Sequence, residues 1–156
     1  MIDPVRNRAI GELQLASLEA GHLIRIRVQG TSMLPSLWPG DVLTVLPLTS
    51  AMPAPGDIAL TCNAGRILAH RVIDRRVQDG AVTLITRGDA LTDTDPVAAT
   101  VLGTVTERNG RPLDLLARRP TRLLSLILRL GDRWRPLLAL ALKLRALRVG
   151  FWPASI

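Results

Sequence analysis

Short strand-like segments, separated by turn residues, fill the chain between residues 23 and 107 and constrain its fold more than any other feature. Residues 23–28 alternate apolar and basic side chains, which is the pattern of a half-exposed strand. Turn residues such as Pro55-Gly56 and Gln78-Asp79-Gly80 separate the segments that follow. Short strands at this spacing predict a mainly β protein with a small, coiled antiparallel β-fold. The expected strands cover residues 23–28, 41–46, 57–62, 66–77, 81–86 and 101–107, and Asn109-Gly110 is expected to form a further turn.

The N-terminal region has the signals of a helix. Asp3 suits the N-cap, Pro4 suits the first helical turn, and Gly21 favours the end of a helix over residues 4–20. The predicted organisation is therefore an N-terminal helix in residues 1–21, a β-domain in residues 22–110 and a C-terminal extension in residues 111–156.

The net charge of +7 is concentrated in the C-terminal extension. Residues 111–156 hold ten of the 20 Lys and Arg residues but two of the 13 acidic residues, so this segment carries +8 and the rest of the chain −1. Its leucine-rich stretches, residues 120–130 and 134–149, are expected to form helices. Basic, leucine-rich helices are candidates for contact with an anionic membrane surface or a membrane partner. The alternative is that they pack on the β-domain or on a second copy of the chain.

Several other classes of protein are disfavoured. The chain has no zinc-finger spacing, no aromatic RNA-binding motif and no clear helix-turn-helix pattern, so we expect no nucleic-acid partner. The N-terminus lacks the apolar run of a signal peptide, and the most apolar stretch of the tail, residues 136–142, is far shorter than the roughly 20 residues of a membrane span. The single Cys62 excludes an intramolecular disulfide. We therefore expect a cytoplasmic protein whose tail is a candidate for peripheral membrane contact.

A serine, a histidine and several aspartates lie in separate segments of the central region. Ser32 follows the flexible Gly30 and precedes the rigid Pro35. A serine hydroxyl becomes a nucleophile only when a neighbouring base takes its proton. Of the two histidines, His70 is the better candidate for this base, while His22 at the end of the first helix is expected to face solvent or to cap the helix. With an aspartate to orient the imidazole, these residues predict hydrolase chemistry.

Four short motifs follow one another between residues 24 and 105: Ser32-Met33-Leu34-Pro35, Gly40-Asp41, His70-Arg71-Val72 and Arg87-Gly88-Asp89. Their order resembles that of the signal peptidase and LexA-type serine peptidase superfamily. Some members of this superfamily use a Ser-Lys dyad and others a Ser-His-Asp triad. Because His70 stands at the position of the base, the chain is most similar to the Ser-His-Asp signal peptidases of the endoplasmic reticulum and of archaea. The resemblance implies the signal peptidase fold, with Ser32 as nucleophile and His70 as general base.

Three aspartates are candidates for the acid that orients His70: Asp89, Asp93 and Asp95. The resemblance implies that the acid of the Gly-Asp pair and the acid six residues later both matter, which selects Asp89 and Asp95. We predict that Asp95 orients His70 and that Asp89 has a more structural role. The alternatives are an acidic turn that only caps strands, or a calcium loop, although the bidentate glutamate of such a loop does not follow. We expect no metal and no cofactor.

The backbone N–H of Ser32 is the expected donor to the developing oxyanion. Many signal peptidases resemble this chain here but carry a second serine donor where Gly30 stands, so that donor is missing, and Thr31 is the alternative. The family holds its substrate extended along a sheet edge, which makes residues 23–28, with Arg25 and Arg27, a candidate platform. An ordinary half-exposed strand explains these residues equally well.

Three functions are compatible with these features. The first is a serine endopeptidase resembling signal peptidase, which cleaves an extended leader or signal-type peptide in a peptide or protein substrate. The second is a LexA-type self-cleaving or partner-binding regulatory module. About 22 residues precede the core, which leaves no room for a DNA-binding domain, and Ala64-Gly65 follows Ser32, where a self-cleavage site is not expected. The third is an inactive interaction protein, against which the complete Ser/His/Asp set argues. The oligomeric state stays open.

Overall fold

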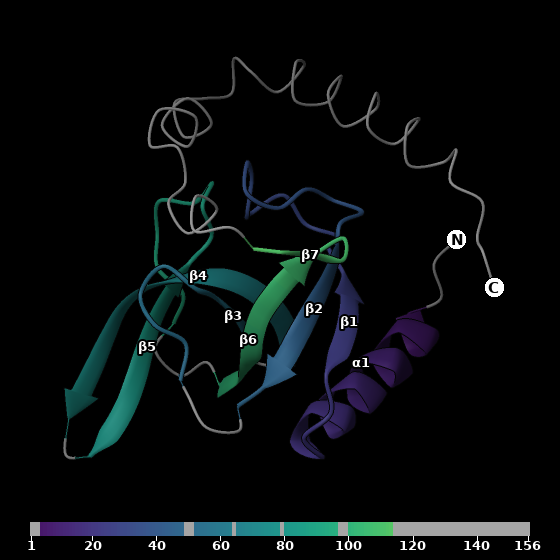
Figure 1. Ribbon diagram of the computed structural model, residues 1–156, viewed down its shortest axis with the longest axis horizontal. Helices are drawn as coiled ribbons and strands as arrows, with labels where there is room; N and C mark the ends of the chain where they lie inside the picture. The colour runs from purple at the N-terminus through teal and green to yellow at the C-terminus, as the bar shows by residue number, and fades with distance from the viewer. Residues whose placement is uncertain (1–3, 49–51, 64, 79, 97–99, 114–156) are drawn as a thin grey trace.

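The computed structural model describes residues 4–48, 52–63, 65–78, 80–96 and 100–113. The predicted helices at residues 120–130 and 134–149 lie outside these residues, and so does all of the extension after Leu113. The described residues contain one helix, which is followed by seven strands (Figure 1). These elements are α1 (Pro4–Glu19), β1 (Ile24–Arg27), β2 (Val42–Pro47), β3 (Ile58–Asn63), β4 (Arg66–Gln78), β5 (Ala81–Arg87), β6 (Thr100–Arg108) and β7 (Arg111–Pro112).

All seven strands belong to one strongly curved antiparallel sheet (Figure 1). The strand order is β1-β2-β6-β3-β4-β5, and every neighbouring pair is antiparallel. β7 pairs with the last two residues of β6, after the Asn109-Gly110 turn. The prediction of a mainly β protein with an N-terminal helix is confirmed, and each predicted strand is present with shifts of at most one residue at its ends. The short β7 was not predicted.

The length of β4 divides this strand into two parts with different neighbours. Residues 66–71 pair with β3 on one side, and pairing with β5 on the other side begins only at Arg71. The second part of β4 and β5 therefore form a two-stranded hairpin that extends beyond β3 (Figure 1). A register shift between Val72 and Asp74 marks a β-bulge near the start of this hairpin. The part of β4 before Arg71 consequently leaves one hydrogen-bonding edge open among the described residues.

Alternation along the strands produces two apolar clusters. Ile58 and Leu60 of β3 point to one face, while Ala59 between them points to the other. The smaller cluster joins Ala59 to Val72 of β4 and Leu84 of β5. Because aromatic residues are scarce, the core is built from aliphatic side chains. The buried members of the larger cluster are Leu18, Ile24, Met33, Leu37, Leu43, Val45, Ile58, Leu60 and Val105.

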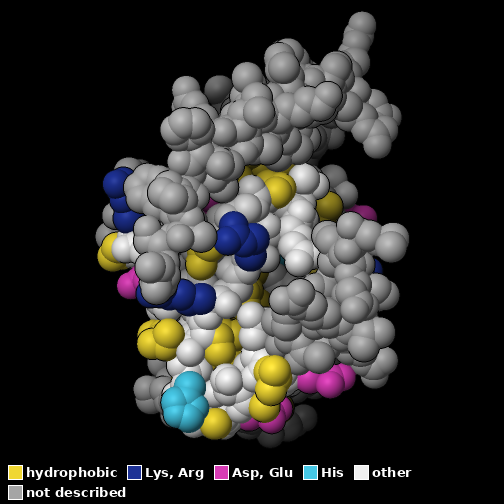
Figure 2. Space-filling model, turned by 90° about the vertical axis from the view of Figure 1, so that its right-hand side faces the viewer, with side chains coloured by type: hydrophobic (Ala, Val, Ile, Leu, Met, Phe, Trp, Pro, Cys, Tyr) yellow, Lys and Arg dark blue, Asp and Glu magenta, His cyan; other side chains and the backbone are white. Residues whose placement is uncertain are grey.

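Helix α1 packs near one edge of the sheet, where its Leu18 enters the larger cluster and Gln14 donates to the backbone oxygen of Arg25 at 3.2 Å (Figure 1). No helix among the described residues is long and apolar enough to cross a bilayer. On the face seen in Figure 2, the described hydrophobic, basic and acidic side chains are interspersed. This part of the surface therefore shows no segregation of one kind of side chain.

Candidate functional site

Ser32 lies in the loop between β1 and β2, at the start of a tight turn. The N–H of Leu34 donates to the oxygen of Thr31 at 3.1 Å, and the N–H of Leu37 donates to the oxygen of Met33 at 3.0 Å. Met33 and Leu37 are buried in the larger apolar cluster, so they anchor the turn to the core. Ser32 itself is only half-buried. Its buried neighbours therefore anchor Ser32, while the residue itself stays partly exposed to solvent.

His70 lies near the middle of β4, opposite Ala59 of β3. Residues directly opposite in an antiparallel pair project to the same face, so the imidazole lies on the face of the smaller apolar cluster. The ring is almost completely buried, with 2% of the residue exposed. Its Nε2 atom lies 2.9 Å from Oγ of Ser32. The sheet therefore brings together two residues that are 38 positions apart in the chain.

Asp95 completes a chain of hydrogen bonds behind the imidazole. Nδ1 of His70 lies 2.6 Å from Oδ2 of Asp95. An ionised carboxylate only accepts hydrogen bonds, so the proton of the neutral imidazole belongs on Nδ1. Nε2 is then the acceptor for the hydroxyl of Ser32. This arrangement is the one in which a histidine can take a serine proton during nucleophilic attack.

Asp89 lies on the opposite side of β4 and has a different partner. The guanidinium of Arg71 donates to both carboxylate oxygens of Asp89, at 2.7 Å each, and also to the backbone oxygen of Gly56 at 2.8 Å. Ser36, four residues after Ser32, donates its hydroxyl to Asp89 and accepts a bond from Arg71 at 3.1 Å. Arg71 and Asp89 are both buried. The two aspartates named from the sequence thus occupy separate hydrogen-bond networks.

The segment around Asp89 also contacts the backbone of Ser32. The N–H of Ala90 donates to the carbonyl oxygen of Ser32 at 2.9 Å. A second tie reaches the same turn from β6, because Arg108 donates to the backbone oxygen of Ser36 at 2.7 Å. These bonds hold the Ser32 turn from two directions, so its geometry is set by the folded sheet rather than by the turn alone.

The predicted site residues divide into those that the structure brings together and those that it does not. Ser32, His70 and Asp95 form one chain of hydrogen bonds, and Asp89 lies beside the same turn through Ser36. Asp93 is exposed, and so is His22. Among the described residues, no group of three acidic, histidine or cysteine side chains is placed to hold a metal. The catalytic roles of Ser32, His70 and Asp95, and the oxyanion role of the Ser32 N–H, stay predictions.

Sequence reasoning missed two hydroxyl residues of the site. Thr86 of β5 donates its hydroxyl to Oδ2 of Asp95 at 2.6 Å, and Ser36 joins Asp89 to the Ser32 turn. Threonine is common in strands and serine is common in turns, so neither residue stood out. No local signal links either hydroxyl to its aspartate, because both contacts form only in the folded sheet.

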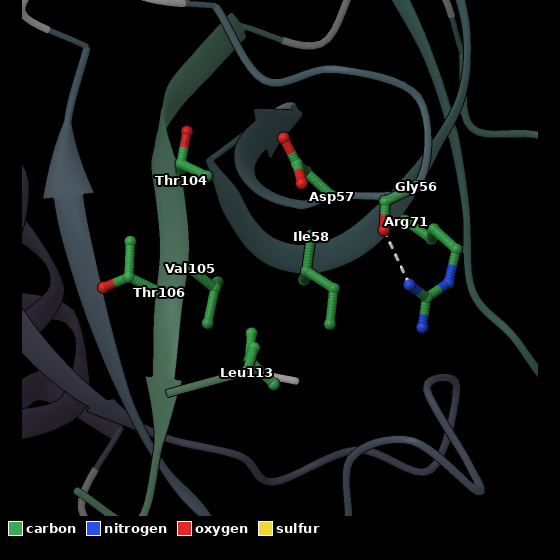
Figure 3. A pocket seen from close by; sticks show the side chains of 8 residues that line it. All are labelled: Gly56, Asp57, Ile58, Arg71, Thr104, Val105, Thr106 and Leu113. Carbon is green, nitrogen blue, oxygen red and sulfur yellow. Dashed lines mark hydrogen bonds between the residues drawn. The ribbon is translucent and has the colours of Figure 1, made fainter. Parts of the chain in front are cut away.

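A cavity of about 150 Å³ is lined by residues of β3, β4 and β6 and by neighbouring loop residues (Figure 3). Ile58, Val105 and Leu113 form its apolar side, and Arg71, which donates to Gly56, also lines it. Ser32 and His70 are not among its lining residues. The cavity therefore borders the Arg71–Asp89 network and not the reactive hydroxyl.

No model of a known protein family matches the chain, and no curated protein matches it.

Proposed function

We propose that this protein is a serine endopeptidase of the signal peptidase type, which cleaves an extended leader or signal-type peptide. The observation that carries the proposal is the continuous chain of short hydrogen bonds from Ser32 through His70 to Asp95. In the proposed reaction, Nε2 of His70 takes the proton of Ser32 while the serine oxygen attacks the scissile carbonyl carbon. The imidazolium then gives this proton to the leaving amine, and water releases the acyl group in a second cycle.

Burial supports this assignment. A buried histidine bonded to a carboxylate often has only a structural role, but here its second nitrogen faces a half-buried serine hydroxyl. A fold without catalytic activity would not require three such side chains in sequence-distant segments to meet. The tight hold on the Ser32 turn also suits catalysis, which gains from a nucleophile kept in a fixed geometry.

An open strand edge near His70 supports an extended peptide as substrate. β1, which leads into Ser32, is an edge strand of the sheet, but α1 lies beside it and Gln14 donates to the backbone oxygen of Arg25. The part of β4 before His70 has its second edge open among the described residues. An extended peptide can add to such an edge through main-chain hydrogen bonds. In this proposal the peptide passes Ser32 while it is bonded to the edge of β4, and the resemblance to signal peptidase implies such an extended substrate.

A serine-directed fluorophosphonate tests the proposed function without knowledge of the natural substrate. The full chain should be labelled at Ser32, as located by peptide mass spectrometry. Ser32→Ala and His70→Ala should abolish labelling, whereas the matched control His22→Ala should label like the wild type, because His22 is exposed and outside the site. Absence of labelling in the folded wild-type chain, or equal labelling of the His70→Ala variant, would show that Ser32 and His70 are not a catalytic pair.

A further inference from the structure

Asp95 accepts two hydrogen bonds on one oxygen atom. Its Oδ2 lies 2.6 Å from Nδ1 of His70 and also 2.6 Å from Oγ1 of Thr86. The backbone of Thr86 adds a third contact, because its carbonyl oxygen accepts the N–H of Asp95 at 2.8 Å. Thr86 thus holds both the main chain and the carboxylate of Asp95.

The pairing of β4 and β5 explains why Thr86 reaches this place. Thr86 lies directly opposite Val72, which is two residues after His70 on β4. Residues two apart share a face of a strand, and directly opposite residues project to the same face. The hydroxyl of Thr86 and the imidazole of His70 are therefore on one face of the sheet. Thr86 is buried, with 3% of the residue exposed.

The segment that carries Asp95 buries few side chains, so it does little to fix the position of Asp95. It lies after β5 in a stretch where residues 91–94 and Pro96 are exposed. Packing of its neighbours in the chain does not fix the carboxylate. The two hydrogen bonds between Asp95 and Thr86 connect this exposed segment to a regular strand, and the bond from the Thr86 hydroxyl does so at Oδ2, the atom that also accepts the bond from His70.

We propose that Thr86 is a positioning residue for the proposed reaction: it fixes the carboxylate of Asp95 against His70 and shares the negative charge of that carboxylate. This inference rests on the proposed function of the site. Thr86 touches neither Ser32 nor the reacting carbonyl, and its own proton stays in place throughout. Its effect reaches the reaction through Asp95 alone.

The shared oxygen leads to two distinct consequences. Without the hydroxyl of Thr86, Asp95 loses its orientation, so the reaction should slow at every pH. The carboxylate of Asp95 would then have His70 as its only partner among these two side chains. A carboxylate that accepts no other hydrogen bond on this oxygen stabilises the imidazolium more strongly. The acidic limb of the pH profile should therefore move to higher pH in a Thr86→Val variant. A purely structural role of Thr86 would change stability but leave this limb in place.

The first test is the rate at which a fluorophosphonate labels Ser32, measured across pH in the full chain. Thr86→Val should lower the rate by about 10- to 100-fold, by analogy with groups that orient the ligands of metal sites, and should move the acidic limb to higher pH. Thr86→Ser should retain the rate and the profile, because it retains the hydroxyl. Thr86→Ala serves as a second variant if the valine variant does not fold. An unchanged rate and profile in either folded variant would overturn the inference.

The matched control is Thr44→Val. Thr44 is also a buried threonine whose hydroxyl donates to a carboxylate, that of Glu107 at 2.9 Å, but it lies on β2, away from His70. Its loss should reduce stability without a change in the labelling profile. A shift of the acidic limb in Thr44→Val as large as that in Thr86→Val would assign the effect to general loosening and contradict the role of Thr86.

A second readout separates the failure of this inference from the failure of the proposed function. The Nδ1 proton of His70 should give a far-downfield proton NMR signal in the wild type and in Thr86→Ser, and His70→Ala identifies it. In Thr86→Val this signal should broaden or shift, whether or not Ser32 reacts. If the wild type is not labelled but the signal responds to Thr86→Val, the peptidase proposal fails and the positioning role stands. If labelling occurs and the signal does not respond, the positioning role fails.

Discussion

Gly88 lies so close to Ser32 that a Cβ atom on Gly88 would come within 2.6 Å of the carbonyl oxygen of Ser32. Real Cβ atoms essentially never approach a backbone oxygen so closely. Ala90, two residues after Gly88, donates its N–H to the same oxygen at 2.9 Å. A glycine is therefore needed at position 88 for the segment after β5 to reach the backbone of the Ser32 turn.

We expect Gly88→Ala to disable the site more than it destabilises the fold. The added methyl group must displace the Ser32 backbone, and a shift of about 1 Å in a reacting group can lower a rate about 100-fold. The overpacking itself should cost about 1–3 kcal/mol of unfolding free energy. Urea unfolding and the fluorophosphonate labelling rate per folded molecule measure the two effects.

Gly103→Ala is the matched control for this prediction. A Cβ atom on Gly103 would approach the oxygen of Leu46 to 2.3 Å, on β6, two strands away from His70. This variant should be destabilised as well, but its folded molecules should be labelled at the wild-type rate. If both variants lose labelling in proportion to their stability alone, the close approach of Gly88 has no special effect on Ser32.

Substitution of Asp95 and substitution of Asp89 should have different effects. Asp95→Asn leaves the shape of the side chain but removes the charge that holds the His70 tautomer, so labelling should fall by about 10³- to 10⁴-fold at nearly unchanged stability. Asp89→Asn leaves the buried Arg71 without its charged partner, which should cost about 3–5 kcal/mol of unfolding free energy. Chemical denaturation and labelling of the folded fraction separate these results. An Asp89→Asn variant that keeps its stability and loses labelling would reverse the two roles.

Much of the fold followed from local pattern. Residues 66–86 illustrate why: a long apolar–polar pattern surrounds Gln78-Asp79-Gly80, and such a turn leaves a hairpin as the simplest arrangement. The same local rules did not find β7, because a two-residue strand that ends in Pro112 carries no periodicity. They also carried no information on the order β1-β2-β6-β3-β4-β5, which depends on contacts distant in the chain.

The separation of the two aspartates also depends on the sheet. His70 and Arg71 are adjacent, so they project to opposite faces of β4, and each meets a different aspartate. The sequence offered Asp89, Asp93 and Asp95 as candidates, and the resemblance to signal peptidase selected Asp89 and Asp95 and favoured Asp95 for His70. Thr86 remained hidden because its position opposite Val72 is fixed by the β4–β5 register. The register of a strand pair depends on turn geometry and on side-chain packing together, so it cannot be read from a short motif.

Asn109 gives a prediction on stability that is independent of the reaction. It has a positive φ of 54°, and its side chain joins β6 to the residues after the Ser32 turn. Its Nδ2 donates to Oδ1 of Asp41 at 2.9 Å, and its Oδ1 accepts the N–H of Val42 at 2.8 Å. Asn109→Asp would place a carboxylate against Asp41 and should cost about 1–3 kcal/mol of unfolding free energy.

The loss from Asn109→Asp should shrink as the pH falls toward about 4, where carboxyl groups begin to take up protons. Asn109→Gly is the matched control, since it keeps the favourable backbone conformation and loses the two side-chain bonds without adding charge. Urea unfolding at several pH values should show a pH-dependent difference from the wild type for the aspartate variant alone. The same difference at every pH in both variants would show that repulsion from Asp41 does not contribute.

The last prediction concerns residues 111–156, which carry a net charge of +8. Basic, leucine-rich segments favour the interface of an anionic bilayer, where each basic residue near the surface contributes about 1 kcal/mol. The full chain should therefore float with vesicles that contain phosphatidylserine and stay behind with vesicles of phosphatidylcholine alone.

Replacement of Arg118, Arg119 and Arg122 by Gln should weaken flotation strongly. Replacement of the exposed Arg66, Arg75 and Arg76 of β4 by Gln removes the same charge and should have little effect. Equal losses in the two variants would indicate attraction by net charge, and no flotation of the wild type at low salt would leave the tail as a surface for packing or for a protein partner.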